Sequence, residues 1–105
     1  MIIKLDKLFL DNEEVILKTN RDNAMNVLKK LDENDYMWWR GERIFDAYNT
    51  IEEILQSDEP LFIFIKKDKT LTWENDVDFV NLYLIVHEGD YDKAIPIISD
   101  YQLNL

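Results

Sequence analysis

A continuous apolar run at residues 61–65 (LFIFI) is the feature that most constrains the fold of this chain. Four of its five side chains are aromatic or β-branched, a composition typical of a β-strand. Residues 66–69 (KKDK) are typical of a turn, and residues 70–73 (TLTW) alternate polar and apolar side chains. The segment therefore predicts two antiparallel strands joined in a hairpin.

Two helices are predicted from capping signals and helical spacing. Residues 20–34 can begin with Asn20 as the cap and Asp22 in the first turn, followed by apolar residues at helical spacing, namely Ala24, Val27, Leu28 and Leu31. Thr50 and Glu53 match a capping box at the start of a shorter helix that ends near residues 57–60. This second helix would place Ile51, Ile54 and Leu55 on one side.

The other segments are mainly β-like. Residues 14–19 (EVILKT) predict a strand, which a hairpin could pair with residues 4–10, although residues 4–10 also fit helical spacing. Residues 36–39 (YMWW) predict a short buried strand that ends at Gly41. Residues 77–87 are rich in strand-forming side chains, so we favour a strand over a helix there.

The C-terminal segment completes the predicted fold. A helix can begin at Asp90 or Asp92, Pro96 would interrupt it, and the apolar residues that follow are expected to cover the sheet, namely Ile95, Ile97, Ile98 and Tyr101. The predicted fold class is α+β, with an antiparallel sheet of about four to five strands on which one main helix and one short helix pack.

The composition predicts a single small acidic domain over residues 1–105. Of the residues, 47% are hydrophobic and 12% aromatic, which is enough apolar surface for a core despite the many charges. Cysteine is absent, which excludes disulfides and fits a reducing cytoplasm. Residues 1–14 lack the apolar stretch of a signal peptide, and no run approaches the ~20 residues of a membrane span. We expect a cytoplasmic protein with no membrane partner.

Negative charge is the clearest indication of the partner. The chain carries 22 Asp and Glu against 12 Lys and Arg, a net charge of −10, which disfavours direct binding to nucleic acid. After residue 69 there are seven acids and one base. Solvated turns explain the total charge, whereas a polarised acidic face favours steering toward a basic protein. The expected contacts form two groups at neighbouring ends of a strand or hairpin: Glu74, Asp76, Asp78, Glu88, Asp90 and Asp92.

An aromatic and arginine cluster at residues 36–43 has the composition of a binding hot spot. Neighbouring strand residues point to opposite faces, so if Trp38 faces the core, Trp39 must point away from it. Trp39 and Arg40 are therefore added to the predicted partner contacts. The alternative is that both tryptophans are structural.

No motif in the chain indicates catalysis. His87 is the only histidine, and no nucleophile elbow accompanies the two serines. An EF-hand loop begun at Asp76 would place Asn81 where glycine is required. A catalytic acid needs burial, and Asp78 is the nearest case of an acid within an apolar run. We predict no catalytic, metal-binding or cofactor-binding residues, and a protein that is not an enzyme.

Residues 20–76 carry a resemblance to a known group. A helix is followed by DYMWWRGE at residues 35–42, by LFIFI at residues 61–65 and by LTW at residues 71–73. This succession resembles small uncharacterised phage and prophage proteins of Firmicutes, in which a helix, a G-Y-x-W-x-x-G-E-like strand end and a hairpin follow one another. The resemblance implies a bacterial host cell and an anti-defence context, including acidic anti-CRISPR proteins that occupy DNA-binding grooves.

The expected function is that of a non-enzymatic acidic binding protein. It would inhibit a basic, nucleic-acid-handling protein, such as a CRISPR effector, by DNA mimicry, because carboxylates can engage the Lys and Arg side chains that bind phosphate. Two alternatives stay open. One is an immunity or antitoxin-like protein that neutralises a toxin, and the other is a small metal-dependent hydrolase that uses the same acids.

Overall fold

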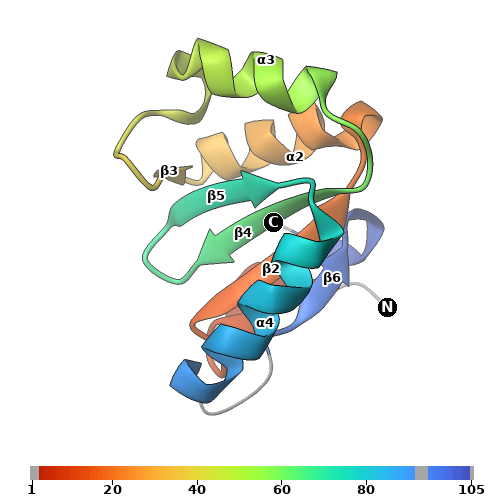
Figure 1. Cartoon of the computed structure of the whole chain (residues 1–105). Coiled ribbons are helices and arrows are strands. Elements are labelled where there is room, and N and C mark those ends of the chain that lie inside the picture. The colour runs from red at the N-terminus through yellow and green to blue at the C-terminus, as the bar shows by residue number, and fades with distance from the viewer. Residues whose placement is uncertain (1–2, 92–94, 105) are drawn as a thin grey trace.

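The sheet of this protein is mixed rather than antiparallel. A computed structural model describes residues 3–91 and 95–104 and shows an α+β fold. Five strands form the main sheet: β2 (Glu14–Thr19), β3 (Met37–Trp38), β4 (Leu61–Lys66), β5 (Thr70–Glu74) and β6 (Ile97–Ser99). Their order across the sheet is β3-β5-β4-β2-β6 (Figure 1). The antiparallel pairing of β4 with β5 confirms the predicted hairpin.

The two edge strands correct the prediction of an antiparallel sheet. β3 runs parallel to β5, and β6 runs parallel to β2. Each edge strand is reached through a helix, α2 (Arg21–Glu33) before β3 and α4 (Val77–Tyr91) before β6. A helical crossover returns the chain in the direction of the strand before it, which makes both edges parallel. The chain crosses from β2 to β3 at one edge of the sheet and from β5 to β6 at the other edge. Two crossovers of the same handedness that run in opposite directions place their helices, here α2 and α4, on opposite faces of the sheet.

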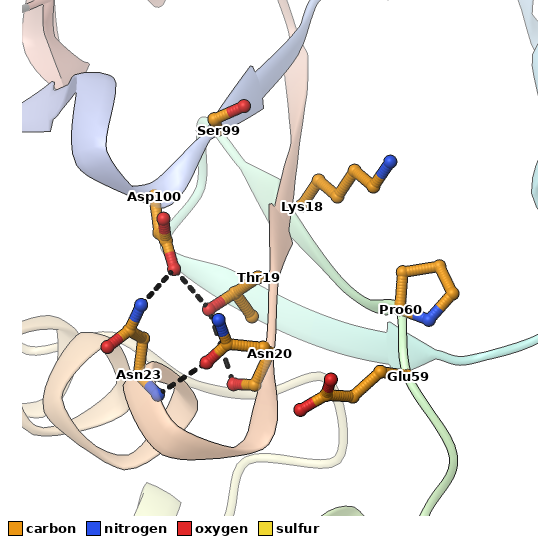
Figure 2. A pocket seen from close by; sticks show the side chains of 8 residues that line it. All are labelled: Lys18, Thr19, Asn20, Asn23, Glu59, Pro60, Ser99 and Asp100. Atoms are coloured by element: carbon orange, nitrogen blue, oxygen red, sulfur yellow. Dashed lines mark hydrogen bonds between the residues drawn. The ribbon is translucent and has the colours of Figure 1, made fainter.

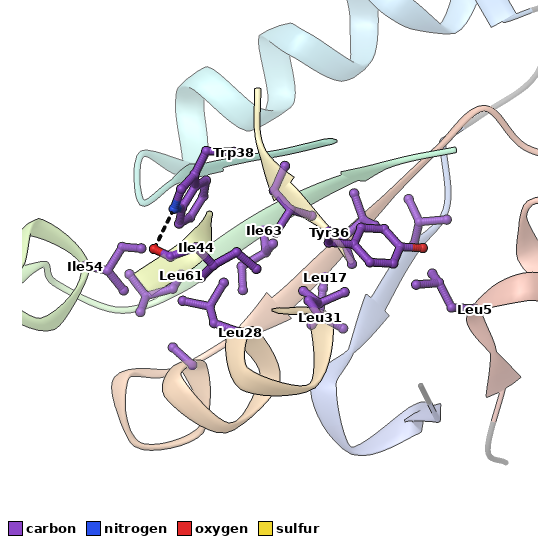
Figure 3. Close-up of a cluster of buried hydrophobic side chains, with 14 of the residues drawn as sticks. Leu5, Leu17, Leu28, Leu31, Tyr36, Trp38, Ile44, Ile54, Leu61 and Ile63 are labelled. Carbon is purple, nitrogen blue, oxygen red and sulfur yellow. Dashed lines mark hydrogen bonds between the residues drawn. The ribbon is translucent and has the colours of Figure 1, made fainter. Parts of the chain in front are cut away.

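The larger core lies between the sheet and the helices α2 and α3 (Tyr48–Gln56), which share one side of the sheet in Figure 1. Alternate residues of the central strands, such as Leu17 and Ile63, meet Leu28 and Leu31 of α2 there (Figure 3). The other residues of the same strands, such as Ile16 and Phe64, form a second cluster with α4. Because both faces are covered, β2 and β4 are buried along most of their length.

The prediction for α2 is confirmed, whereas the start of α3 differs. Asn20 accepts a hydrogen bond from the Asn23 N–H (2.9 Å) and so caps α2 as expected. α3 begins at Tyr48, and Ala47 before it provides no side-chain cap. Thr50 lies inside the helix and does not form the predicted capping box, because a 3-10 turn, η1 (Ile44–Asp46), leads the chain directly into α3.

The strand predicted at residues 77–87 is wrong, because this segment is most of α4. Asp76 starts the helix, since its Oδ1 accepts hydrogen bonds from the N–H groups of Asp78 (3.0 Å) and Phe79 (3.3 Å). Val80, Tyr83, Leu84 and His87 follow at helical spacing and are the more buried residues within 77–87. Helix capping by Asp76 and tertiary packing therefore outweigh the strand-forming composition of residues 77–87.

The chain ends decide one open alternative and correct the C-terminal prediction. Residues 4–10 contain the helix α1 (Leu5–Leu8), which their helical spacing allowed, and not a hairpin partner of β2. Two short strands, β1 (Ile3–Lys4) and β7 (Leu103–Asn104), pair in parallel. Ile98 and Ile95 are buried as expected, but β6 extends the sheet instead of covering it and leaves Ile97 exposed. Asp90 lies near the end of α4 rather than starting a helix, whereas Asp92 is outside the described residues, as is the Tyr101 side chain.

None of the helices in the described ranges combines the length and the apolar character that crossing a membrane requires.

Tyr36→Phe is expected to reduce the loss of stability in alkaline solution. Burial, and to a lesser extent the negative charge of Asp6, raises the pKa of Tyr36 above its usual value of 10.0. The unfolded chain then loses this proton at lower pH than the folded chain does. The stabilising contribution is therefore complete below about pH 10 and is lost as the pH rises through the raised pKa.

Urea unfolding of the two proteins from about pH 8 to pH 11 tests this, and the decline should be steeper for the wild type. Tyr48→Phe serves as the control, because Tyr48 is 75% exposed and its removal should leave the wild-type decline unchanged. Parallel pH profiles for Tyr36→Phe and the wild type would contradict the prediction.

Candidate functional site

Helix α4 is apolar on the side that faces away from the sheet. Its exposed apolar side chains have exposed fractions of 45% to 73% and are Val77, Phe79, Leu82, Ile85 and Val86. The last four share one side of the helix, and we call them the α4 face. A helix that is apolar all round is normally buried, and exposed apolar patches mark contact sites. The α4 face is therefore the strongest candidate for an interaction surface.

The opposite side of α4 is fixed on the sheet. Val80 is buried with Ile16, Phe62 and Phe64, and the rings of Tyr83 and Phe64 make a T-shaped contact at a centroid distance of 4.9 Å. His87, the only histidine, stacks on Tyr83 with 4.1 Å between ring centroids. The sheet side of α4 thus stabilises the fold, and the α4 face is left for contacts outside the chain.

Glu14 is a buried acid that the sequence interpretation missed. It is 1% exposed at the start of β2, and its Oε2 accepts a hydrogen bond from the hydroxyl of Tyr83. Asp78, the acid expected to come nearest to burial, is exposed in the first turn of α4. The available signal was the position of Glu14 directly before the apolar residues 15–17, which places it at a buried end of a strand.

Tyr83→Phe is expected to lower the free energy of unfolding by about 1–3 kcal/mol, because it removes a hydrogen-bond donor from a buried carboxylate. The ring contacts of Tyr83 would remain, so the change isolates the hydroxyl. Urea unfolding monitored by circular dichroism measures it, with the exposed Tyr48→Phe as the matched control. Equal stability of the two variants would show that the Tyr83 hydroxyl contributes nothing to the docking of α4.

The predicted acidic contacts that lie in described residues belong to segments near the two ends of α4. Glu74 accepts hydrogen bonds from the N–H groups of Asn75 (3.0 Å) and Asp76 (3.2 Å), while Asp76 caps the helix. Glu88 and Asp90 belong to the last turns of α4, about 18 Å and 21 Å along the helix axis from Asp76 at 1.5 Å per residue. Asp92 is outside the described residues. The helix thus separates the two acidic groups and places the α4 face between them.

Trp39 and Arg40 line a pocket to which no described residue of α4 contributes. The alternation predicted for this segment is confirmed, since Trp38 is 4% exposed and Trp39 is 62% exposed. The guanidinium carbon of Arg40 is 5.0 Å from the centroid of the Trp39 ring. The adjoining pocket, which we call the tryptophan pocket, has a volume of about 420 Å³ and is lined by Trp38, Trp39, Arg40, Glu42, Asn49, Thr50, Glu53, Thr72 and Trp73.

A second pocket, of about 580 Å³, lies beside the ends of β2 and β6 and the start of α2 (Figure 2). Asp100 Oδ2 accepts hydrogen bonds there from the Thr19 hydroxyl (2.8 Å) and from Asn23 Nδ2 (2.9 Å). Glu59, on the other side, is 3.8 Å from Arg21. These contacts join the C-terminal segment and the loop before β4 to α2, so they explain the polar residues as links between elements.

Residues 3–91 and 95–104 contain no group of three or more His, Cys, Asp or Glu side chains placed to hold a metal ion. Comparison of the chain with models of known protein families, with curated proteins and with solved structures finds no match.

Proposed function

We propose that this protein is a non-enzymatic inhibitor that binds a basic protein through the α4 face. The observation that carries the proposal is an apolar helix side, fixed from behind by Tyr83 and Val80, with exposed acids at its N-terminal end. Protein interfaces commonly combine an apolar centre with a polar rim. Phe79, Leu82 and Val86 follow the i, i+3, i+7 spacing by which a helix fits an apolar groove.

Charge supports a basic partner. The net charge of −10 favours association with a positive surface and repels nucleic acid. Asp76 and Asp78 are exposed at the start of α4, and Asp78 lies on the side of the helix that carries Leu82 and Ile85. These acids would contact positive residues at the rim of the groove while the α4 face fills its apolar centre.

The partner that we propose is a nucleic-acid-handling protein, because such proteins present clustered Lys and Arg side chains. An acidic protein bound to that surface would exclude the nucleic acid and so inhibit the nucleic-acid-handling protein. The resemblance of residues 20–76 to phage proteins supports an anti-defence context by analogy. The apolar side chains between the acidic groups favour a mixed contact over mimicry of phosphates alone.

Affinity capture from a bacterial lysate, followed by binding measurements on the captured protein, tests the proposal. We expect a basic protein whose capture weakens as salt is added and which duplex DNA displaces. The double variant Asp76→Asn with Asp78→Asn should slow association about threefold to tenfold, since asparagine at position 76 can still cap α4.

The matched control is Glu33→Gln with Glu52→Gln, which removes the same charge from exposed positions on α2 and α3, on the other side of the sheet. It should slow association less than the α4 variant does. Capture that is insensitive to salt and to DNA, or equal effects of the two double variants, would contradict the proposal.

A further inference from the structure

The tryptophan pocket brings together all three tryptophans of the chain. Trp38 is held in place because its Nε1–H donates a hydrogen bond to the carbonyl of Ile44 (3.0 Å). Trp73 is half-buried and packs against the larger core, while Trp39 projects into solvent. The pocket therefore has two fixed aromatic residues and one exposed ring. None of these three side chains belongs to the α4 face.

The charges around the tryptophan pocket favour a cation. Glu42 and Glu53 line it with carboxylates, against one positive side chain, Arg40. Both glutamates are exposed, and neither forms an ion pair within the part of the chain that the structure describes. A positive group in the pocket would thus lie near two carboxylates that no salt bridge between described residues neutralises.

The contact between Arg40 and Trp39 shows which cation suits the pocket. At 5.0 Å from the ring centroid, the guanidinium of Arg40 is within the range of a cation–π interaction. A guanidinium is planar, so it can stack on an indole while its N–H groups bind a carboxylate, which a lysine ammonium does less well. We propose that the tryptophan pocket binds an arginine side chain of a protein partner, stacked on tryptophan and hydrogen-bonded to Glu42 or Glu53.

This inference goes beyond the proposed contact of the α4 face, and its test does not need the partner. The probe is N-acetyl-L-arginine methylamide, and the uncharged control is N-acetyl-L-citrulline methylamide. The indole N–H signals of the three tryptophans in an NMR spectrum report on the pocket. We expect saturable shifts of the Trp39 and Trp73 signals with the arginine probe, and weaker or no shifts with the citrulline control.

Three substitutions in the tryptophan pocket should change the affinity for the arginine probe, two by lowering it and one by raising it. Glu53→Gln and Trp39→Ala should each weaken binding of the arginine probe about threefold, as for an exposed ion pair or cation–π contact. Arg40→Gln should strengthen binding of the arginine probe, because the substitution removes a positive charge that already contacts the Trp39 ring. Glu52→Gln, one residue from Glu53 but outside the pocket lining, should have no effect.

Three results would overturn the inference: no saturable shift with the arginine probe, equal binding of the citrulline control, or weaker binding after Arg40→Gln. Leu82→Asp, which alters only the α4 face, should leave the titration unchanged. A failure of the arginine probe to bind would thus leave the proposal for the α4 face intact. Equally, a failure of the proposal for the α4 face would leave the arginine-binding inference intact.

Discussion

Trp38→Ala is expected to lower the free energy of unfolding by about 3–5 kcal/mol, whereas Trp39→Ala should change it by less than about 0.5 kcal/mol. The first substitution leaves a cavity in the larger core and deprives the Ile44 carbonyl of its hydrogen-bond donor (Figure 3). The second removes a side chain that is 62% exposed. Urea unfolding monitored by far-ultraviolet circular dichroism measures both changes without depending on tryptophan fluorescence.

Each variant is the control for the other, because they delete the same side chain from neighbouring positions. Equal losses of stability would contradict the assignment of Trp38 to the core and of Trp39 to the surface. A large loss for Trp39→Ala alone would also remove the basis for placing Trp39 at a binding pocket.

The division between Trp38 and Trp39 is a part of the structure that sequence alone could predict. Side chains of a strand alternate between faces, so two adjacent tryptophans cannot both be buried on one side. The hairpin of β4 and β5 and the capped helix α2 were predictable for a similar reason, since local signals at residues 61–73 and at Asn20 agree with the tertiary structure.

Helix α4 shows where the sequence interpretation failed. Its apolar and aromatic residues suit a strand as well as a helix, so composition did not separate the two. The deciding contacts come from distant residues, above all Glu14 and Phe64, which hold Tyr83 on the sheet. The parallel edge β6 was missed because α4, the crossover helix before it, was assigned as a strand, and that changes the expected direction of the strand that follows. The parallel edge β3 was missed although α2 was predicted, because its pairing partner β5 is distant in the sequence.

The error in α4 also concealed the candidate site. In a strand, Phe79 and Ile85 would lie on one face while Leu82 and Val86 lay on the other. In the helix these four residues share one side, and the apolar patch exists only there. The acids were recognisable from the sequence, but two of them, Glu74 and Asp76, also have structural roles at the start of α4.

Leu82→Asp is expected to weaken binding of the captured basic partner at least about 30-fold, the effect of losing a hot-spot residue worth about 2 kcal/mol. Leu82 lies near the middle of the α4 face and is 60% exposed, so the stability of the isolated protein should change by less than about 0.5 kcal/mol. The substitution adds a charge that attracts a basic surface. A loss of affinity would therefore identify the apolar contact as its cause.

The outcome separates two modes of inhibition. If the acids bound the partner by imitating phosphates alone, Leu82→Asp would leave the affinity unchanged or raise it, because it extends the row of carboxylates. If the α4 face fills an apolar groove, a buried and unpaired carboxylate at position 82 would oppose binding. Leu10→Asp is the matched control, since Leu10 is 80% exposed outside α4. Binding titrations of the captured protein with both variants, at one salt concentration, distinguish the two modes.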